Sequence, residues 1–227
     1  MDRFVRASRS SSMNASSIKA VALDVFGTLL FIGERRQPYR TLFERLSVNF
    51  SEGARRAMTQ NVSLTGLADQ LSGSGRSDAA AVASLEAEVA AEIESVRSFP
   101  EVAGALADLR TRGFRLALIS NLAAPYARAV EEKLPPIFDA RVYSFAVGAV
   151  KPEPAIFAVL SERLCLPPDQ ILVVGNSRRD DVGGARRFGM NALHLDRRPG
   201  APEAPNVVPD LNALVRWLDN SAPQGTP

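Results

Sequence analysis

Cysteine and histidine are almost absent from this sequence of 227 residues. The single cysteine, Cys165, excludes an internal disulfide framework and a multi-cysteine zinc site, and the single histidine, His194, excludes a histidine-rich metal centre. A chain of this length buries roughly 70% of its unfolded surface and needs neither kind of cross-link. We expect Cys165 to be a small core residue on an apolar helix and His194 to be structural.

Long apolar runs and charge of a single sign are also missing. The nearest candidate for a membrane helix, residues 18–31, is shorter than the required ~20 residues and contains Asp24. The 27 Lys and Arg residues are scattered and stand against 25 Asp and Glu, which leaves a net charge of +2. A nucleic-acid-binding surface would gather its basic residues into a stripe. These features predict a soluble, cytoplasmic protein that binds neither membranes nor nucleic acid, and they leave the oligomeric state open.

Short apolar runs alternate with segments of helical periodicity. The runs end in turn or polar residues, as buried strands of a parallel sheet do, at residues 20–23, 115–119, 171–174 and 191–195. Helical patterns cover residues 100–109, 153–164, 180–188 and 210–218. This alternation predicts the α/β class, with a three-layer, Rossmann-like core built on a parallel sheet.

One block interrupts the alternation with helical patterns and no convincing strand. The patterns lie at residues 39–46, 54–58 and 79–96. About 60 helical residues after the first strand are typical of an inserted subdomain. We expect a disordered leader at 1–17, an α/β core at 18–33 and 98–219, a helical cap domain at 34–97, and a disordered tail at 220–227.

Oxygen-bearing side chains follow three of the predicted strands. They are Asp24, then Ser120 with Asn121, then Asn176 with Ser177 and Asp181. Each has an ordinary explanation, because Asp before a turn accepts a backbone hydrogen bond and Ser or Asn commonly caps a helix. Ligands of open parallel sheets, however, bind at the carboxyl ends of the strands. The recurrence of such groups at one edge therefore favours a functional site.

Lysine is rare, occurring only at Lys19, Lys133 and Lys151. Pro152 disfavours a helix at Lys151 and places this lysine on a loop, where most lysines are simply solvated. A buried site beside a carboxylate, however, calls for a compact ammonium group rather than arginine. We therefore include Lys151 in the candidate site.

In order along the chain, these residues resemble the four motifs of the haloacid dehalogenase superfamily. The matching segments are Asp24-Val25-Phe26-Gly27-Thr28, Ser120-Asn121, Lys151-Pro152, and Gly175-Asn176-Ser177 followed by Asp181. The resemblance covers residues 18–195 and identifies the helical block as that superfamily's cap domain. It implies a hydrolase in which Asp24 forms a covalent ester with the substrate, which water then cleaves.

The resemblance also implies roles for individual residues. Lys151 would keep Asp24 ionised, and Asp181 would orient Lys151. Hydrogen bonds to Asp24, to the substrate or to the leaving group would come from Thr28, Ser120 and Asn121. These six residues form the predicted catalytic set.

Two positions depart from the magnesium-dependent phosphatases of the superfamily. Phe26 stands where phosphatases carry a second aspartate that acts as general acid and base, a role typically worth ~10²–10⁴-fold. Asn176 stands where they carry a magnesium-binding aspartate, and an amide oxygen is a weaker ligand for this hard cation. The dehalogenase branch has an aromatic residue at the first position and needs no metal, although Phe157 lacks the hydroxyl of the tyrosine usual in that branch.

We therefore favour a 2-haloacid dehalogenase-like hydrolase that uses no cofactor and acts on a small anionic molecule. The expected substrate-binding residues are Phe26, Asn176, Ser177 and a cap arginine, with Arg40 the candidate ahead of Arg35 and Arg36. Two alternatives stay open. A phosphatase of small phosphate esters would hold Mg²⁺ with Asp24, the Phe26 carbonyl and Asn176. A catalytically silent member would bind a metabolite or a partner in the same cleft.

Overall fold

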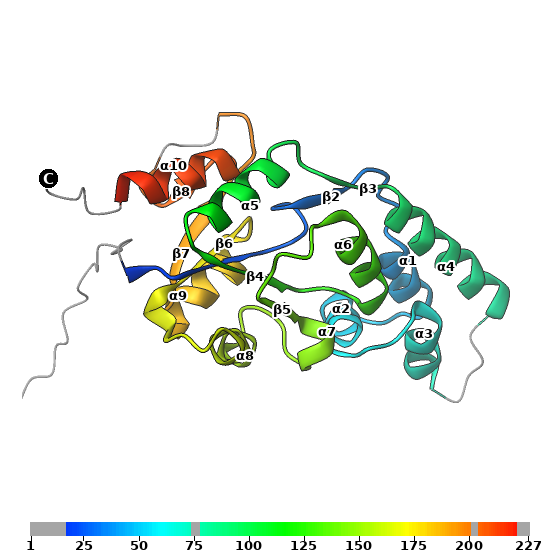
Figure 1. Cartoon of the computed structure of the whole chain (residues 1–227). Coiled ribbons are helices and arrows are strands. Elements are labelled where there is room, and N and C mark those ends of the chain that lie inside the picture. Colours follow the sequence, from blue (N-terminus) through cyan, green and yellow to red (C-terminus); the bar gives the residue numbers. More distant parts are fainter. Residues whose placement is uncertain (1–16, 74–77, 201–203, 222–227) are drawn as a thin grey trace, which may run out of the picture.

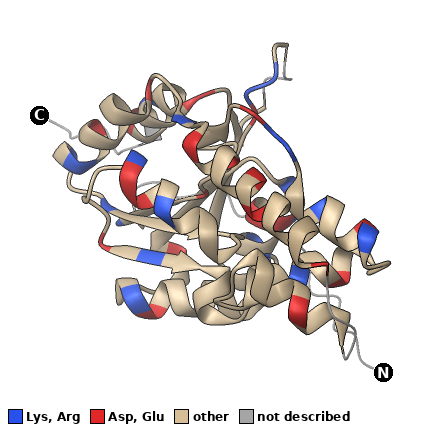
Figure 2. Cartoon of the chain, turned by 90° about the vertical axis from the view of Figure 1, so that its right-hand side faces the viewer, with Lys and Arg blue, Asp and Glu red and all other residues tan. Residues whose placement is uncertain are grey.

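The computed structural model describes residues 17–73, 78–200 and 204–221. The predicted leader and tail lie mainly outside these residues, although helix α10 (Leu211–Ser221) includes the first two residues of the predicted tail. No helix in the described ranges is long and apolar enough to cross a membrane. On the face shown in Figure 2, basic and acidic residues are interspersed over the helices.

A parallel sheet forms the centre of the molecule (Figure 1). Its six described strands are β1 (Ala20–Leu23), β4 (Arg115–Ser120), β5 (Ala140–Tyr143), β6 (Ile171–Gly175), β7 (Asn191–Leu195) and β8 (Val207–Val208). Their order is β5-β4-β1-β6-β7-β8, and every neighbouring pair is parallel. The predicted α/β class is confirmed, with β5 and β8 as strands that the sequence patterns missed. Because β1 lies between β4 and β6, the three strand ends that carry polar side chains are adjacent.

Helices cover both faces of the sheet and complete the three layers (Figure 1). On one face lie α5 (Val102–Thr111), α6 (Ala127–Lys133) and α10, and on the other lie α8 (Pro154–Leu164) and α9 (Gly184–Phe188). A short helix, α7 (Ser144–Val147), follows β5. Successive residues of a strand point to opposite faces. Leu23 accordingly joins the core under the first set of helices and Ala22 joins the core under the second.

A helical unit is inserted after β1, as the resemblance implied. Its helices are α1 (Pro38–Arg45), α2 (Phe50–Thr59), α3 (Leu64–Ser72) and α4 (Ala79–Glu94), of which α3 was not predicted. The side chains of Asn49, Ser63 and Asp78 accept backbone N–H groups at the starts of α2, α3 and α4. Such caps stabilise helix ends that are otherwise left without partners.

The prediction of no strand within residues 34–97 was wrong at the end of that block, where β3 begins at Val96. Strands β2 (Leu30–Ile32) and β3 (Val96–Ser98) pair antiparallel, and this ribbon carries the chain from the core into the cap and back. Strands of three residues are too short for a periodicity signal, and they form here because the two ends of the insertion must lie side by side.

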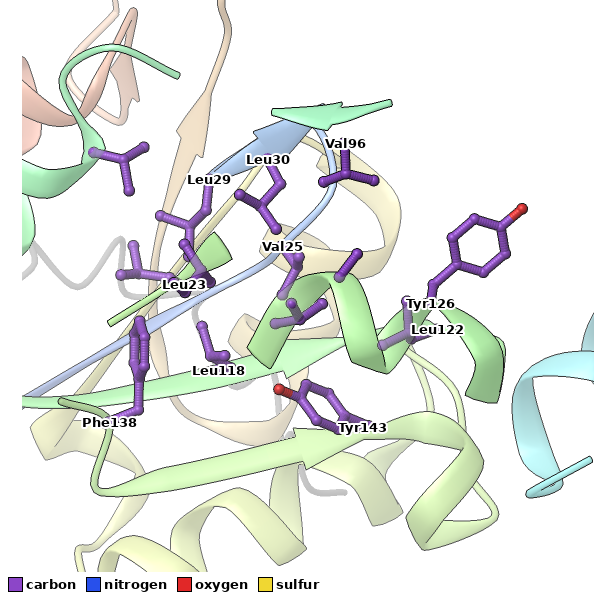
Figure 3. Close-up of a cluster of buried hydrophobic side chains, with 14 of the residues drawn as sticks. Leu23, Val25, Leu29, Leu30, Val96, Leu118, Leu122, Tyr126, Phe138 and Tyr143 are labelled. Atoms are coloured by element: carbon purple, nitrogen blue, oxygen red, sulfur yellow. The ribbon is translucent and has the colours of Figure 1, made fainter. Parts of the chain in front are cut away.

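An apolar cluster anchors the residues that follow β1. Figure 3 shows Leu23 of β1, Leu118 of β4, Leu30 and Val96 of the ribbon, and Val25 close together. All five side chains are fully buried. Because burial of apolar surface stabilises by roughly 25 cal/mol per Å², this cluster holds the segment around Asp24 in one place.

The structure also bears on the helix predicted at residues 180–188 and on the predictions for Cys165 and His194. The helix predicted at residues 180–188 is a π-helix, η4 (Arg178–Gly183), followed by α9, and π turns are frequent at functional sites. Cys165 is not a core residue, because α8 ends at Leu164 and Cys165 is exposed in a left-handed conformation with φ 47°. His194 is buried, with its Nε2 3.1 Å from the carbonyl oxygen of Asn176.

Candidate active site

Asp24 lies at the carboxyl end of β1, in the centre of the sheet edge. Its backbone N–H donates to the carbonyl of Val174 on β6 at 2.9 Å. Beyond it the chain turns tightly, and the carbonyl of Val25 accepts the N–H of Leu29 at 2.8 Å. Gly27 has a φ of 86°, a conformation that favours glycine. The turn leaves Asp24 only 6% exposed.

Lys151 lies between two buried carboxylates. Its Nζ is 2.7 Å from Oδ1 of Asp24 and 2.6 Å from Oδ1 of Asp181. The ammonium also donates to the carbonyl of Ile119 at 2.9 Å, so its three protons have three acceptors. None of the three charged side chains is more than 8% exposed. Charges this far from water persist only when they are paired and hydrogen-bonded, as they are here.

Two hydroxyl groups complete the surroundings of the Asp24 carboxylate. The Thr28 hydroxyl donates to Oδ2 at 3.2 Å, and the Ser120 hydroxyl donates to Oδ1 at 3.4 Å. Oδ1 therefore has both Ser120 and Lys151 as partners and Oδ2 has Thr28, while the backbone N–H of Val25 also donates to this carboxyl group. The two oxygens of Asp24 are chemically distinct.

Asn121 holds the loop that carries Lys151. Its Nδ2 donates to the Lys151 carbonyl at 2.9 Å, and its Oδ1 accepts the Lys151 N–H at 2.7 Å. The peptide bond between Lys151 and Pro152 is cis. Both the oxygen and the nitrogen of the Asn121 side-chain amide are thus hydrogen-bonded to the backbone of Lys151. This geometry favours a positioning role for Asn121 over the donation to a leaving group expected from the sequence.

Asp181 is oriented by the first turn of η4. Its Oδ2 accepts the N–H of Ser177 at 2.8 Å, which turns Oδ1 toward Lys151. The Ser177 hydroxyl in turn accepts the N–H of Asp180 at 3.0 Å. A Cβ on Gly175 would lie 2.3 Å from the Asp181 carboxylate, so only glycine permits this approach.

Burial and the charge of the neighbouring groups both act on the pKa values of Asp24 and Lys151. Burial raises the pKa of Asp24, the charge of Lys151 opposes that rise, and Asp181 adds to it. Burial alone lowers the pKa of Lys151, but the charges of Asp24 and Asp181 outweigh it and the pKa is raised. Lys151 is therefore a cation at neutral pH, and Asp24 relies on it to remain a carboxylate.

Two cavities flank the cluster. The first, which we name the cap pocket, has a volume of about 320 Å³ and lies between the core residues Phe26 and Asn121 and the cap helices α1 and α2. The second, of about 560 Å³, is lined by Gly27, Asn176 and residues that follow β7. Asp24 lines neither cavity, although both cavities reach its neighbours in the turn. We expect the cap to move when a substrate reaches this carboxylate.

The predicted substrate-binding residues divide between these cavities. Phe26 and Arg40 both line the cap pocket, and the Arg40 guanidinium lies 4.7 Å from the ring centroid of Phe50. Asn176 is exposed and lines the second cavity. Ser177 is engaged within its own loop and lines neither. The structure thus places Phe26 and Arg40 together and separates them from Asn176.

Arg197 is a contributor that the sequence analysis did not single out. Its Nη2 donates to the carbonyl of Thr28 at 2.7 Å and lies 2.6 Å from Oε1 of Glu101. Its guanidinium carbon lies 3.7 Å from the ring centroid of Phe99. Arg197 thereby ties the turn after Asp24 to the segment that returns from the cap. Its place just after the predicted strand 191–195, at the same sheet edge, was an available signal.

Fold and site together define a class of protein, with a parallel α/β core, an inserted helical cap and a buried aspartate–lysine–aspartate cluster at the strand ends. The chain belongs to the haloacid dehalogenase-like hydrolase family, whose sequence model matches residues 18–189. The resemblance found in the motifs is confirmed at this level.

Individual relatives fall into both branches of the family. Phosphoserine phosphatase of Thermus thermophilus is 35% identical over 115 residues, which cover 50% of this chain and 46% of the relative. (S)-2-haloacid dehalogenase 4A of Burkholderia cepacia is 28% identical over 112 residues, 48% of each chain. The chain thus spans about half the length of the curated relatives it matches. The structure of L-2-haloacid dehalogenase from Xanthobacter autotrophicus superimposes with a TM-score of 0.62 at 22% identity, covering 90% of this chain and all of that one, which shows a shared fold.

Proposed function

We propose that this protein is a metal-independent hydrolase of the 2-haloacid dehalogenase type, with the Asp24 carboxylate as the nucleophile. The proposal depends chiefly on one observation, the contact of 2.7 Å between Asp24 Oδ1 and Lys151 Nζ in a buried site. The ammonium keeps the carboxylate ionised where little water solvates it. A carboxylate in that state can displace a halide from carbon when it is held in line with the carbon–halogen bond.

The proposed reaction has two steps. In the first, a carboxylate oxygen of Asp24 bonds to the carbon that carries the halogen, and the halide leaves with the electron pair of the broken bond. In the second, water adds to the carbonyl carbon of the Asp24 ester, the hydroxy acid leaves and the carboxylate is restored. Each turnover releases one halide, one hydroxy acid and one proton. No proton is needed by the departing halide, which suits a site where Phe26 replaces a general acid.

The different partners of the two Asp24 oxygens support different roles for them in the proposed reaction. Oδ2, which accepts the Thr28 hydroxyl at 3.2 Å and is not bonded to the Lys151 ammonium, is the oxygen freer to attack. Oδ1 faces Lys151 and Ser120. Negative charge develops on this oxygen when water adds to the ester, so Lys151 and Ser120 would stabilise the intermediate there. Asp181 and Asn121 would keep Lys151 in place.

The residues at the expected magnesium position suit that ion poorly. Magnesium would rest on Asp24, the Phe26 carbonyl and the Asn176 amide, a donor set with one negative charge. Both oxygens of Asp24 already have partners, and the described residues contain no group of three or more His, Cys, Asp or Glu side chains suited to a metal. Mg²⁺ favours carboxylate oxygens in near-octahedral geometry. The proposed reaction accordingly has no metal step.

A phosphatase is the second candidate, favoured by the similarity to phosphoserine phosphatase. Its first step would also use Asp24, with phosphorus as the atom attacked. The alkoxide of a phosphate ester is a poor leaving group and normally needs a proton from a general acid. In this chain Phe26 stands at the position of that acid. This candidate therefore predicts activity only on phosphates with good leaving groups.

Product release with and without metal separates the candidates. We expect chloride release from 2-chloropropionate that EDTA does not reduce, and no phosphate release from phosphoserine with Mg²⁺. Phosphate release that depends on Mg²⁺, without chloride release, would assign the phosphatase branch. Binding of either compound without any product would indicate a catalytically silent member.

Two further measurements test the covalent step. Asp24→Asn keeps the shape of the side chain but removes the nucleophile and should abolish chloride release. Asp108, which is exposed on α5, provides the matched control, because Asp108→Asn should leave chloride release unchanged. A single turnover in H₂¹⁸O should place the heavy oxygen in the peptide that contains Asp24. Label found only in the product would show that water attacks the substrate directly.

A further inference from the structure

A continuous series of aromatic rings runs from the candidate active site into the cap. The ring of Phe26 contacts Tyr126 edge to face at 6.0 Å between centroids, and Tyr126 lies 6.3 Å from Tyr39. Tyr39 is followed by Phe43 at 6.3 Å, and Phe43 by Phe50 at 6.0 Å. All five rings line the cap pocket. We name this series the aromatic wall.

The inner end of the aromatic wall adjoins the reacting carboxylate. Phe26 is two residues after Asp24, and Asn121, which also lines the cap pocket, follows Ser120 directly. At the outer end Phe50 is 49% exposed, and Arg40 lies over its ring. The wall thus leads from the surface of the cap to the strand ends.

The cap pocket is larger than a short haloacid requires. Its volume of about 320 Å³ lies at the lower end of the ~300–1,000 Å³ typical of pockets that hold drug-sized ligands. A three-carbon haloacid has about six non-hydrogen atoms, fewer than the ligands that pockets of this size usually hold. The pocket therefore has room for a substituent larger than the methyl group of such an acid.

One polar atom in the aromatic wall has no hydrogen-bond partner within residues 17–73, 78–200 and 204–221. It is the buried hydroxyl of Tyr39, whereas the hydroxyl of Tyr126 donates to Glu92. Glu92 accepts the N–H groups of Arg36 and Gln37 on its other oxygen, Oε1, which fixes the orientation of this carboxylate. Burial raises the pKa of Tyr39, which keeps its proton available for donation. A buried hydroxyl without a partner costs free energy unless a ligand supplies one.

We propose that the cap pocket binds an aromatic ring, or an apolar group of similar size, carried by an anionic substrate. The ring lies against the aromatic wall, the reacting atom lies at the Phe26 and Asn121 end, and the Tyr39 hydroxyl donates to a polar atom of the substrate. Aromatic side chains recognise such groups through offset and edge-to-face contacts. The reaction of this substrate depends on the proposed dehalogenase function. The binding of the ring in the cap pocket does not depend on it.

Binding of unreactive acids tests the proposal without turnover. We would measure the affinities of propionate, hexanoate and 3-phenylpropionate for the wild-type protein by calorimetry. We expect 3-phenylpropionate to bind at least tenfold more tightly than propionate, with hexanoate between them. Equal affinities for the three acids would overturn the assignment.

Two variants in which an alanine is replaced by leucine test whether the ring binds in the cap pocket. Ala54 on α2 lines the cap pocket, and Ala54→Leu narrows it. Ala90 is exposed on α4, so Ala90→Leu adds the same side chain to the cap outside the pocket. The preference for 3-phenylpropionate should disappear in Ala54→Leu and persist in Ala90→Leu. A preference that survives in Ala54→Leu would place the ring elsewhere and overturn the proposal, and far-UV circular dichroism checks that both variants fold.

Turnover distinguishes a failure of this proposal from a failure of the proposed function. If the ring preference holds but 2-chloro-3-phenylpropionate and 2-chloropropionate both release no chloride, the pocket assignment stands and the dehalogenase proposal fails. If 2-chloropropionate is turned over but the larger acids bind no better, the reaction stands and the pocket assignment fails.

Discussion

Replacing Lys151 with methionine removes the single positive charge between Asp24 and Asp181 while keeping a side chain of similar length. Both carboxylate oxygens lie within 2.7 Å of the same nitrogen, so they are at most roughly 5 Å apart. At an effective dielectric constant of about 20, two unit charges at that separation repel by ~3 kcal/mol. Breaking a buried ion pair by removing one partner typically costs about 3–5 kcal/mol. We therefore expect Lys151→Met to lose about 3–5 kcal/mol in free energy of unfolding at pH 7.5.

The pH dependence of this loss has a defined sign. Burial already raises the pKa of Asp24, and loss of the opposing Lys151 charge raises it further above the ~3.9 of an unfolded aspartate. Such a group binds more protons in the folded state than in the unfolded state at intermediate pH. Stability then rises as the pH falls, by at most about 1.4 kcal/mol per unit for each group. The deficit of the variant should therefore shrink between pH 7.5 and pH 5.

Urea unfolding followed by circular dichroism at the two pH values measures both effects. Lys133→Met is the matched control, because Lys133 is exposed on α6 and its removal should change stability by less than about 1 kcal/mol. A loss below about 1 kcal/mol for Lys151→Met at pH 7.5 would refute the reasoning. A stability difference between Lys151→Met and the wild type that grows from pH 7.5 to pH 5 would also refute it.

Three further predictions concern Asp24 and Tyr39. Asp24→Asn should lower kcat by about 10³-fold or more. Its melting temperature should stay equal to or above that of the wild type, because Lys151 keeps Asp181 as its counter-ion and the repulsion between two buried carboxylates is removed. A clear drop in melting temperature would contradict this. The proposed reaction needs ionised Asp24, and burial raises the pKa of this carboxyl above 3.8. We therefore expect kcat/KM to fall on acidification with an apparent pKa above 3.8. An apparent pKa at or below 3.8 in the pH profile would count against Asp24 as the nucleophile. Tyr39→Phe removes a buried hydroxyl that has no partner in the described part of the chain. The free protein should be equally stable or up to about 2 kcal/mol more stable by urea unfolding, whereas a loss of more than about 1 kcal/mol would show that the hydroxyl has a partner.

The amino-acid sequence by itself determined the architecture in outline. The strands β1, β4, β6 and β7 were predictable because strands buried on both faces must be short, continuous apolar runs. The cap was predictable because its helices keep their periodicity wherever they pack. The short strands β2, β3 and β8 carry no such pattern, since their conformation comes from pairing with a distant segment. Cys165 was misjudged because periodicity does not reveal the residue at which a helix ends.

The residue types of the candidate site were also evident from the sequence, whereas their catalytic roles stay predictions. What only the tertiary structure decided was which groups meet. Asp24 and Lys151 are 127 positions apart along the chain. They come within hydrogen-bond distance because β4 lies between β1 and β5 in the sheet, and Asn121, after the end of β4, binds the backbone of the loop that carries Lys151. The same packing commits Asn121 to the backbone of Lys151, directs Arg197 to the turn after Asp24, and assembles the aromatic wall from cap and core. Contacts of this kind depend on the relative placement of whole elements, and a linear pattern of residues carries no record of that placement.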